Sequence, residues 1–103
     1  MVQAVENLTA LTLRLLARTA HPRLDDWDLA TCQVLASVPV PGMADLISPN
    51  LTGSRLSLGI RRELLQDVVL GATLHLRARL GSSGDILAEP HPATGDFRVE
   101  RPS

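Results

Sequence analysis

Two segments of this chain share a pattern of residues that could do chemistry. Residues 21–27 read HPRLDDW and residues 91–97 read HPATGDF, so both fit the pattern His-Pro-x-x-x-Asp-aromatic. If the segments met in space, two imidazoles and two carboxylates would converge, and such groups bind zinc or transfer protons. The competing interpretation is one structural joint used twice, in which each proline ends a strand and each aromatic opens the next. The residues in question are His21, Pro22, Asp26, Trp27, His91, Pro92, Asp96 and Phe97.

The other chemistry-bearing residues lack the spacing of a known kind of site. Zinc sites pair their ligands at short intervals, whereas the three histidines stand far apart and Cys32 is the single cysteine. Cys32 falls on an inward strand face, where a thiol behaves as an inert apolar group. The acids around Trp27 are typical turn or cap residues. We therefore predict no catalytic residue, no metal and no cofactor, and we favour the joint interpretation because it also accounts for the prolines and aromatics.

Length and charge limit the class of protein. A chain of 103 residues, 45% of them hydrophobic, predicts one globular domain over residues 1–100 and a frayed tail at 101–103. The net charge of −1 provides no overall field toward nucleic acid or an anionic membrane. The sequence has neither a signal peptide nor an apolar run of about 20 residues, so we predict a cytoplasmic protein that does not enter a membrane.

Six segments are predicted as strands, and along the first four of them apolar and polar residues alternate, which is the pattern of half-buried strands. Residues 81–85 (GSSGD) predict a hairpin loop, and residues 61–69 (RRELLQDVV) predict a short helix that Gly71 closes. Helices over 4–18 and 25–38 also fit the spacing of the apolar residues, but the period of two and the β-branched residues favour strands there. The six segments are 11–18, 29–40, 55–60, 72–80, 86–89 and 96–100.

The predicted elements are three strands, a short helix, and two or three further strands. Their order resembles a mostly β, five- to six-stranded Greek-key barrel of the oligonucleotide/oligosaccharide-binding type (OB-fold), in which a helix bridges the third and fourth strands. The resemblance is one of element order and covers residues 8–100.

Arginine supplies all ten basic residues, and six of them point away from the core in this prediction. A basic stripe on a barrel could follow a nucleic-acid backbone. Barrels of this kind bind single strands largely by stacking bases on aromatic rings, and the chain has only two aromatics, so nucleic-acid binding is the alternative hypothesis. The stripe comprises Arg14, Arg18, Arg55, Arg61, Arg77 and Arg79.

A protein partner or self-association is the function that we predict first. The connection at 39–54 carries apolar side chains that a small barrel does not bury completely, so it forms either a folded-over lid or a docking surface. Leu16 and Leu35 interrupt the polar faces of the first two strands, and edge strands invite pairing with another chain. The sequence predicts a non-catalytic binding or assembly module, such as an accessory subunit, with partner-binding residues Val40, Met43, Leu46 and Ile47.

Overall fold

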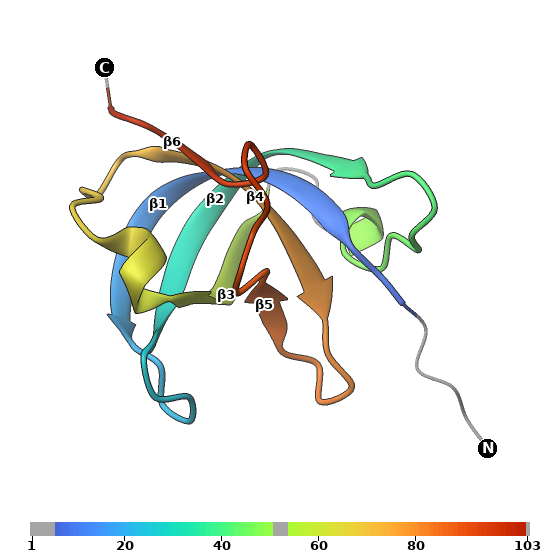
Figure 1. Ribbon diagram of the computed structural model, residues 1–103, viewed down its shortest axis with the longest axis horizontal. Coiled ribbons are helices and arrows are strands. Elements are labelled where there is room, and N and C mark those ends of the chain that lie inside the picture. The colour runs from blue at the N-terminus through green and yellow to red at the C-terminus, as the bar shows by residue number, and fades with distance from the viewer. Residues whose placement is uncertain (1–5, 51–53, 103) are drawn as a thin grey trace.

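The computed structural model describes residues 6–50 and 54–102 and has the form of a small β-barrel (Figure 1). The start of the helix considered at residue 4 and the last residue of the predicted tail lie outside the described residues. No helix in the described part of the chain is long and apolar enough to cross a membrane. The described elements are β1 Thr9–Ala20, β2 Trp27–Pro39, η1 Ser48–Asn50, β3 Arg55–Arg61, η2 Arg62–Leu65, β4 Thr73–Leu80, β5 Ile86–Ala88 and β6 Arg98–Glu100, where η denotes a 3-10 turn.

The strands follow one another in the order β1-β2-β3-β5-β4, and β4 pairs back with β1 to close the barrel. β3 and β5 run parallel, and the other neighbouring strands are antiparallel. β6 and β5 pair with the same edge of β4. β6 pairs with its first residues and β5 with its last. This topology confirms the predicted Greek-key barrel resembling an OB-fold, with strands where helices over 4–18 and 25–38 were the alternative.

The short helix predicted at 61–69 is present between β3 and β4 but is shorter than predicted, because η2 is a single 3-10 turn over Arg62–Leu65. The backbone is extended on both sides of it, with φ −57° and ψ 133° at Arg61 and φ −58° and ψ 132° at Gln66. Leu65 is completely buried, so one turn is enough to insert this side chain into the end of the barrel. The β-branched residues that follow favour extended backbone over further helix.

The interior of the barrel is almost entirely aliphatic. Alternation along each strand turns every second side chain inward, and the leucines of β1, β3 and β4 fill most of the space. The buried cluster comprises Leu11, Leu13, Leu15, Ala30, Cys32, Val34, Ile47, Leu56, Leu58, Ile60, Leu65, Leu74, Leu76, Ala78 and Ala88.

A β-bulge in β1 shifts the alternation of that strand. Leu15 pairs with Cys32 and Ala17 pairs with Thr31, so Leu16 is an extra residue with no partner of its own. Strict alternation from Leu15 would place Ala17 inward, but it is exposed, because the bulge exchanges the two faces of the strand beyond it.

A second bulge in β2 has the same effect. The register shifts by one residue between Val34 and Ala36, so Leu35 is the extra residue. Strict alternation from Val34 would place Ala36 and Val38 inward, but beyond the bulge both are exposed, and Val38 keeps 55% of its surface. Leu16 and Leu35, which interrupt the alternation in the sequence, are therefore the bulge residues themselves.

Gly59 lets β5 approach β3 closely enough to close the barrel. The ladder between these strands is the parallel pair Gly59↔Leu87. A Cβ atom on Gly59 would lie 2.7 Å from Cδ2 of Leu87 and 3.3 Å from Cε3 of Trp27, which is too close for the present packing. Glycine is required here for space and not for a left-handed backbone.

We expect Gly59→Ala to lower the free energy of unfolding by about 1–3 kcal/mol, because the side chains packed on Gly59 must move apart. Chemical denaturation measures this change, with Ser57→Ala as the control, since Ser57 is exposed on the same strand. The control is expected to change the free energy of unfolding by less than about 0.5 kcal/mol. An unchanged denaturation midpoint for Gly59→Ala would show that closure does not depend on this contact.

Candidate functional site

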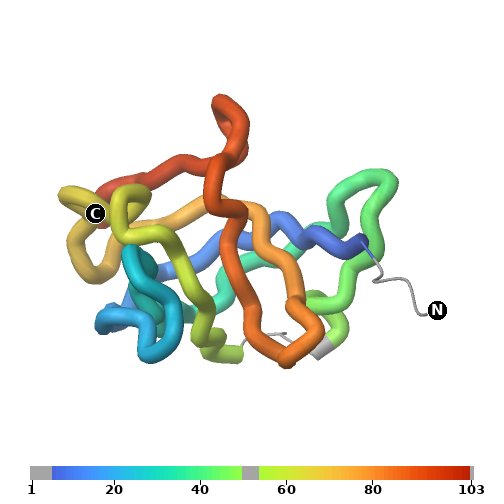
Figure 2. The backbone as a smooth tube through the Cα atoms, turned by 60° about the horizontal axis from the view of Figure 1, so that its bottom comes forward, coloured from blue at the N-terminus to red at the C-terminus, as the bar shows by residue number. Residues whose placement is uncertain are grey.

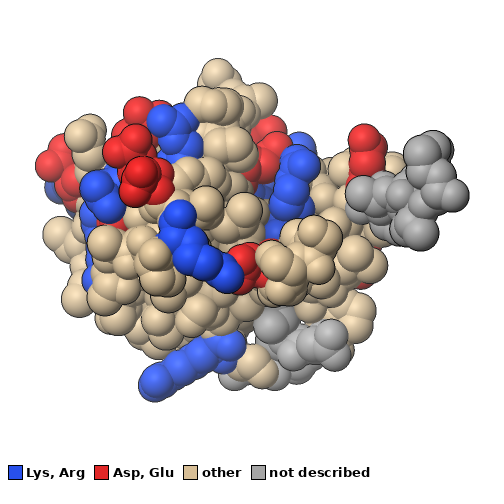
Figure 3. All heavy atoms as spheres, turned by 90° about the horizontal axis from the view of Figure 1, so that it is seen from below, with Lys and Arg blue, Asp and Glu red and all other residues tan. Residues whose placement is uncertain are grey.

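In barrels of the OB type, the outer face of β2 and β3 and the loops after β1 and β4 form the usual ligand surface. In this chain those loops are residues 21–26 and 81–85, and both project from the same end of the barrel (Figures 1 and 2). An ion pair between Arg23 and Asp85 joins them. Seen from this end, basic and acidic side chains are interspersed over the surface (Figure 3). The loop end is therefore not a uniformly charged surface.

The first His-Pro segment forms a turn organised by its histidine. Nδ1 of His21 accepts hydrogen bonds from the backbone N–H groups of Arg23 and Leu24, both at 3.1 Å. The opposite edge of the ring lies over Gly59, since Cδ2 would be 3.4 Å from a Cβ atom there. Pro22 stands two residues after the end of β1. One ring nitrogen of His21 is thus used within its own turn.

The other end of this segment connects the turn to β2 and η2. Asp26 has a left-handed backbone with φ 65°, and its carbonyl oxygen accepts a hydrogen bond from the N–H group of Arg62 at 2.8 Å. Trp27 begins β2 and packs its ring over Gly59. The indole is half-buried, so it offers only part of its surface to a ligand.

The second His-Pro segment contacts β3 at Arg61, two residues after Gly59, where the first segment packs. Both ring nitrogens of the exposed His91 lie near Nη1 of this arginine, Nδ1 at 3.1 Å and Nε2 at 3.4 Å. Pro92 lies four residues after the end of β5. Asp96 forms an ion pair with Arg77 at 3.4 Å. Phe97 packs against the core, half-buried, and β6 begins at the next residue.

The two segments reach neighbouring positions on β3 but do not share one backbone geometry. The left-handed residue of the first is Asp26, whereas in the second it is Gly95 with φ 89°, one position earlier in the shared pattern. His21 bonds within its own turn and His91 contacts a strand, so the two histidines also differ in role. Within residues 6–50 and 54–102, no group of three or more His, Cys, Asp or Glu side chains is placed to hold a metal ion.

The six arginines of the predicted stripe divide into two equal groups. Arg61 lies 3.3 Å from Glu63, Arg77 pairs with Asp96, and Arg18 pairs with a buried acid described below. These three positive charges are largely compensated. The other three are exposed and have no ion-pair partner among the residues that the structure describes, and they are Arg14, Arg55 and Arg79.

Two of the unpaired arginines lie in one row across three strands. Arg14 of β1 pairs with Gln33 of β2, and Gln33 pairs with Arg55 of β3. All three side chains are exposed on the outer face. β1 and β3 contain no acidic residue, and the one acid of β2, Asp28, is buried. We call Arg14, Gln33 and Arg55 the arginine row.

Asp28 is a buried charge that sequence reasoning assigned to a turn or helix cap. It lies in β2 and is 5% exposed. Nε of Arg18 donates to its Oδ2 atom and Nε of Arg62 donates to its Oδ1 atom, each at 3.0 Å. The alternation of the strand indicates this burial, because Asp28 lies on the same inward face as Ala30 and Cys32.

The predicted outward position of Arg18 is wrong, and the bulge at Leu16 is the reason. Beyond the bulge Arg18 pairs with the buried Ala30, so it faces the interior and not solvent. At this end of the barrel its guanidinium binds Asp28, and Nη1 donates a further hydrogen bond to the carbonyl oxygen of Leu65 at 2.7 Å. Arg18 thus stabilises the turn that carries the Leu65 side chain.

The predicted partner-binding loop is mostly folded onto the barrel. Val40 and Ile47 are buried at 9% and 3% exposure, so they cannot contact a partner in this conformation. Met43 is half-buried, and Leu46 is 41% exposed. The backbone N–H of Leu8 donates to the carbonyl oxygen of Ala44 at 3.0 Å, which ties the loop to the chain just before β1. Val40 and Ile47 therefore belong to a folded-over lid, whereas Met43 and Leu46 keep exposed surface.

Asp45 fixes this loop from its centre. Its Oδ1 atom accepts hydrogen bonds from the Thr9 hydroxyl at 2.7 Å and from the backbone N–H groups of Ile47 and Ser48 at 3.1 and 2.8 Å. Burial alone would raise the pKa of this carboxyl, but the hydrogen bonds from Ser48, Thr9 and Ile47 outweigh it and lower the pKa. The ionised carboxylate is thus the form that holds the lid in place.

The strand order, the parallel β3–β5 pair and the closure by β1 and β4 define the chain as a small barrel resembling an OB-fold. No known protein family, curated protein or solved structure matches the sequence or the fold of this chain.

We expect Asp28→Asn to lower the free energy of unfolding by about 1–3 kcal/mol, because two arginines lose their counter-ion at a buried position. Arg18 and Arg62 keep 28% and 49% of their side-chain surface, so water compensates part of this loss. Urea denaturation of Asp28→Asn and of the exposed control Asp25→Asn measures the difference. Equal stability of the two variants would show that the buried carboxylate is not structural.

We expect Cys32 to be inert in the folded protein. Burial raises the pKa of its thiol to about 12, so almost no reactive thiolate exists near neutral pH. Its reaction with a colorimetric disulfide reagent should be about a hundredfold or more slower than in the guanidinium-unfolded chain. Rapid labelling of the folded protein would contradict the closed packing around β2.

Proposed function

We propose that this protein is a non-catalytic binding module that docks an acidic segment of another protein on the arginine row. The observation that carries the proposal is the register, which aligns Arg14 and Arg55 on either side of Gln33 across β1, β2 and β3. Neither arginine has an ion-pair partner among the described residues. An acidic partner would satisfy both guanidinium groups by paired hydrogen bonds.

The surroundings of the arginine row suit a protein interface. Thr31 and Ser57 form the neighbouring outward pair, so the surface beside the row is polar and uncharged. Leu35 stands next to it with 43% of its surface exposed, because the bulge turns it outward. Protein interfaces combine arginine with exposed apolar side chains of this kind, and arginine often contributes much of the binding energy.

The charge of this surface favours a different chain over a second copy as the partner. In a symmetric dimer, the same patch of both copies meets, so the arginine row of one copy would face that of the other. Like charges in contact oppose association, and β1 and β3 supply no acid to compensate. The accessory-subunit form of the predicted function therefore has more support than the self-associating form.

Single-stranded nucleic acid is the second candidate, since the row lies on the face that barrels of this type use for oligonucleotides. A phosphate backbone would also satisfy two free arginines. Three of the six stripe arginines are in ion pairs, however, and the Trp27 ring is packed over Gly59. Both facts weaken a mode of binding that depends on a continuous basic groove and free aromatic faces.

The test compares two double variants that change the net charge equally. Arg14→Glu/Arg55→Glu alters the row, and the control Arg79→Glu/Arg98→Glu alters exposed arginines of β4 and β6. We expect a fluorescent peptide of about ten alternating Glu and Leu residues to bind the wild type and the control at low salt, and to lose about tenfold in affinity with the row variant, or about 1.4 kcal/mol. Fluorescence anisotropy measures the affinity.

The same titration with oligo-dT distinguishes the second candidate. Binding of the oligonucleotide that falls steeply between about 50 and 200 mM salt, and that both double variants weaken, would support the nucleic-acid function instead. Equal affinity of the wild type and the row variant for the peptide would contradict the proposed docking surface. Sedimentation of the wild type as a stable dimer that the row variant abolishes would contradict the choice of a different chain as partner.

A further inference from the structure

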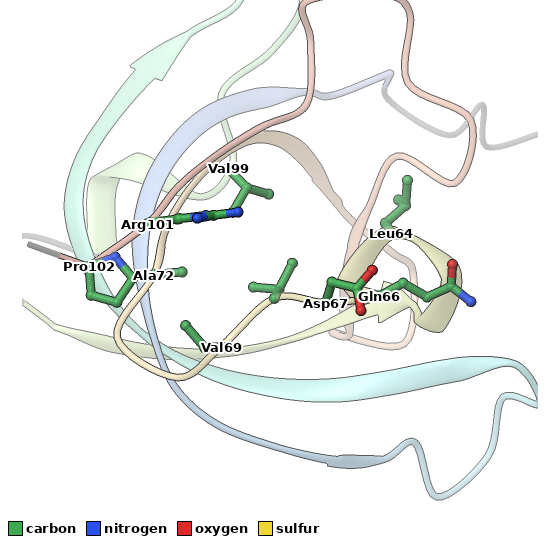
Figure 4. A pocket seen from close by; sticks show the side chains of 9 residues that line it. Leu64, Gln66, Asp67, Val69, Ala72, Val99, Arg101 and Pro102 are labelled. Carbon is green, nitrogen blue, oxygen red and sulfur yellow. The ribbon is translucent and has the colours of Figure 1, made fainter.

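A hollow of about 580 Å³ opens at the mouth of the barrel, between the connection after η2 and the last described residues (Figure 4). Small-molecule sites commonly have volumes of about 300–1,000 Å³ and often lie in the mouths of barrels. The lining residues include Gln66, Asp67, Val69, Val99 and Arg101.

Part of the wall of the hollow is apolar and continues the core beyond β4. β6 places Val99 beside the fully buried Leu74, so Val99 lies on the side of the strand that faces the interior. Val99 and Val69 nevertheless keep 40% and 56% of their surface exposed. Removing such apolar surface from water is favourable, so a ligand that contacts these valines gains binding energy.

Two opposite charges flank this apolar surface without meeting each other. Arg101 lies on the side of β6 and the tail, whereas Asp67 lies with Gln66 on the opposite side (Figure 4). Neither charge has an ion-pair partner among the described residues, so the two groups are more than 4.0 Å apart. The hollow thus offers a cation at one side, an anion at the other and an apolar surface between them.

The wall that carries Arg101 is held in place by a side-chain pair. Nε2 of His75 on β4 lies 2.9 Å from Oε2 of Glu100 on β6. The hydrogen bond and the charge of His75 lower the pKa of Glu100, so the carboxylate stays ionised in this contact. Because Arg101 directly follows Glu100, this pair connects the chain next to the cationic side of the hollow to β4.

We propose that the hollow binds a small, elongated zwitterion with an apolar body. Its carboxylate would pair with the Arg101 guanidinium, which binds carboxylates through two parallel hydrogen bonds. Its ammonium group would pair with Asp67, and the body would cover Val69 and Val99. An ω-amino carboxylic acid and a short apolar peptide with free ends share this chemistry. An α-amino acid does not, since its two charges are adjacent.

The experiment titrates the full chain with 6-aminohexanoate and records backbone amide shifts by NMR. We expect residues 64–72 and 99–102 to shift, with a dissociation constant of about 1 mM for a ligand of this size. Hexanoate and hexylamine, each of which keeps one charged end, should bind about fivefold or more weakly. No shift in these residues at about 50 mM ligand would overturn the proposal.

Two single variants test the two ends separately. Arg101→Gln should weaken the binding of 6-aminohexanoate and hexanoate about fivefold and leave that of hexylamine unchanged. Asp67→Asn should weaken the binding of 6-aminohexanoate and hexylamine about fivefold and leave that of hexanoate unchanged. Asparagine tolerates the left-handed backbone of Asp67, which has φ 62°, so the second variant is not expected to strain the loop. Arg98→Gln and Asp25→Asn are the matched controls. Equal effects of all four variants on the three ligands would overturn the assignment of the ends.

A tripeptide distinguishes the two sources of this chemistry. Binding of Val-Ala-Val about tenfold tighter than 6-aminohexanoate, lost when both of its ends are blocked, would identify peptide ends as the ligand. Tighter binding of 6-aminohexanoate would identify a free ω-amino acid. Undiminished binding of the blocked peptide would overturn the proposal, because an apolar groove would then suffice without its charges.

Discussion

The barrel closes where β5 meets β3, and this closure depends on the missing side chain of Gly59. The pair Gly59↔Leu87 is the whole ladder between the two strands, so a wider spacing would leave the sheet open. Leu87 and the rings of Trp27 and His21 then occupy the space above the glycine. The first loop is thereby packed against the closure, and the face of β2 and β3 becomes a fixed surface between ordered loops.

Alternation made most of this fold predictable, because one face of each strand must be buried. The period of two identified β1, β2, β3 and β4, and the turn residues at 81–85 identified the hairpin that adds β5. The helix predicted at 61–69 is shortened to η2 for a physical reason. Its composition permits a helix, but the barrel needs only one buried side chain there, Leu65, and a single turn supplies it.

The candidate site was less predictable, since it depends on which loops meet. Exposure of Arg14 and Arg55 follows from their strand positions, and their alignment follows from a register that periodicity alone does not give. The ion pair of Arg77 with Asp96 joins residues from separate elements, and the lid that buries Ile47 is held by a hydrogen bond between Thr9 and Asp45. Such contacts are long-range, so no local pattern in the sequence indicates them.

The bulge at Leu16 links the surface of the barrel to its interior. Without the extra residue, Arg14 and Arg18 would share one face of β1, as strict alternation requires. With it, Arg14 stays outside in the arginine row, and Arg18 turns inward to bind Asp28 and the carbonyl oxygen of Leu65. Leu65 then closes the end of the barrel, and the chain that follows it forms one wall of the hollow. A single inserted leucine therefore separates an arginine that is free to meet a partner from one that stabilises the fold, and both proposed binding surfaces depend on that separation.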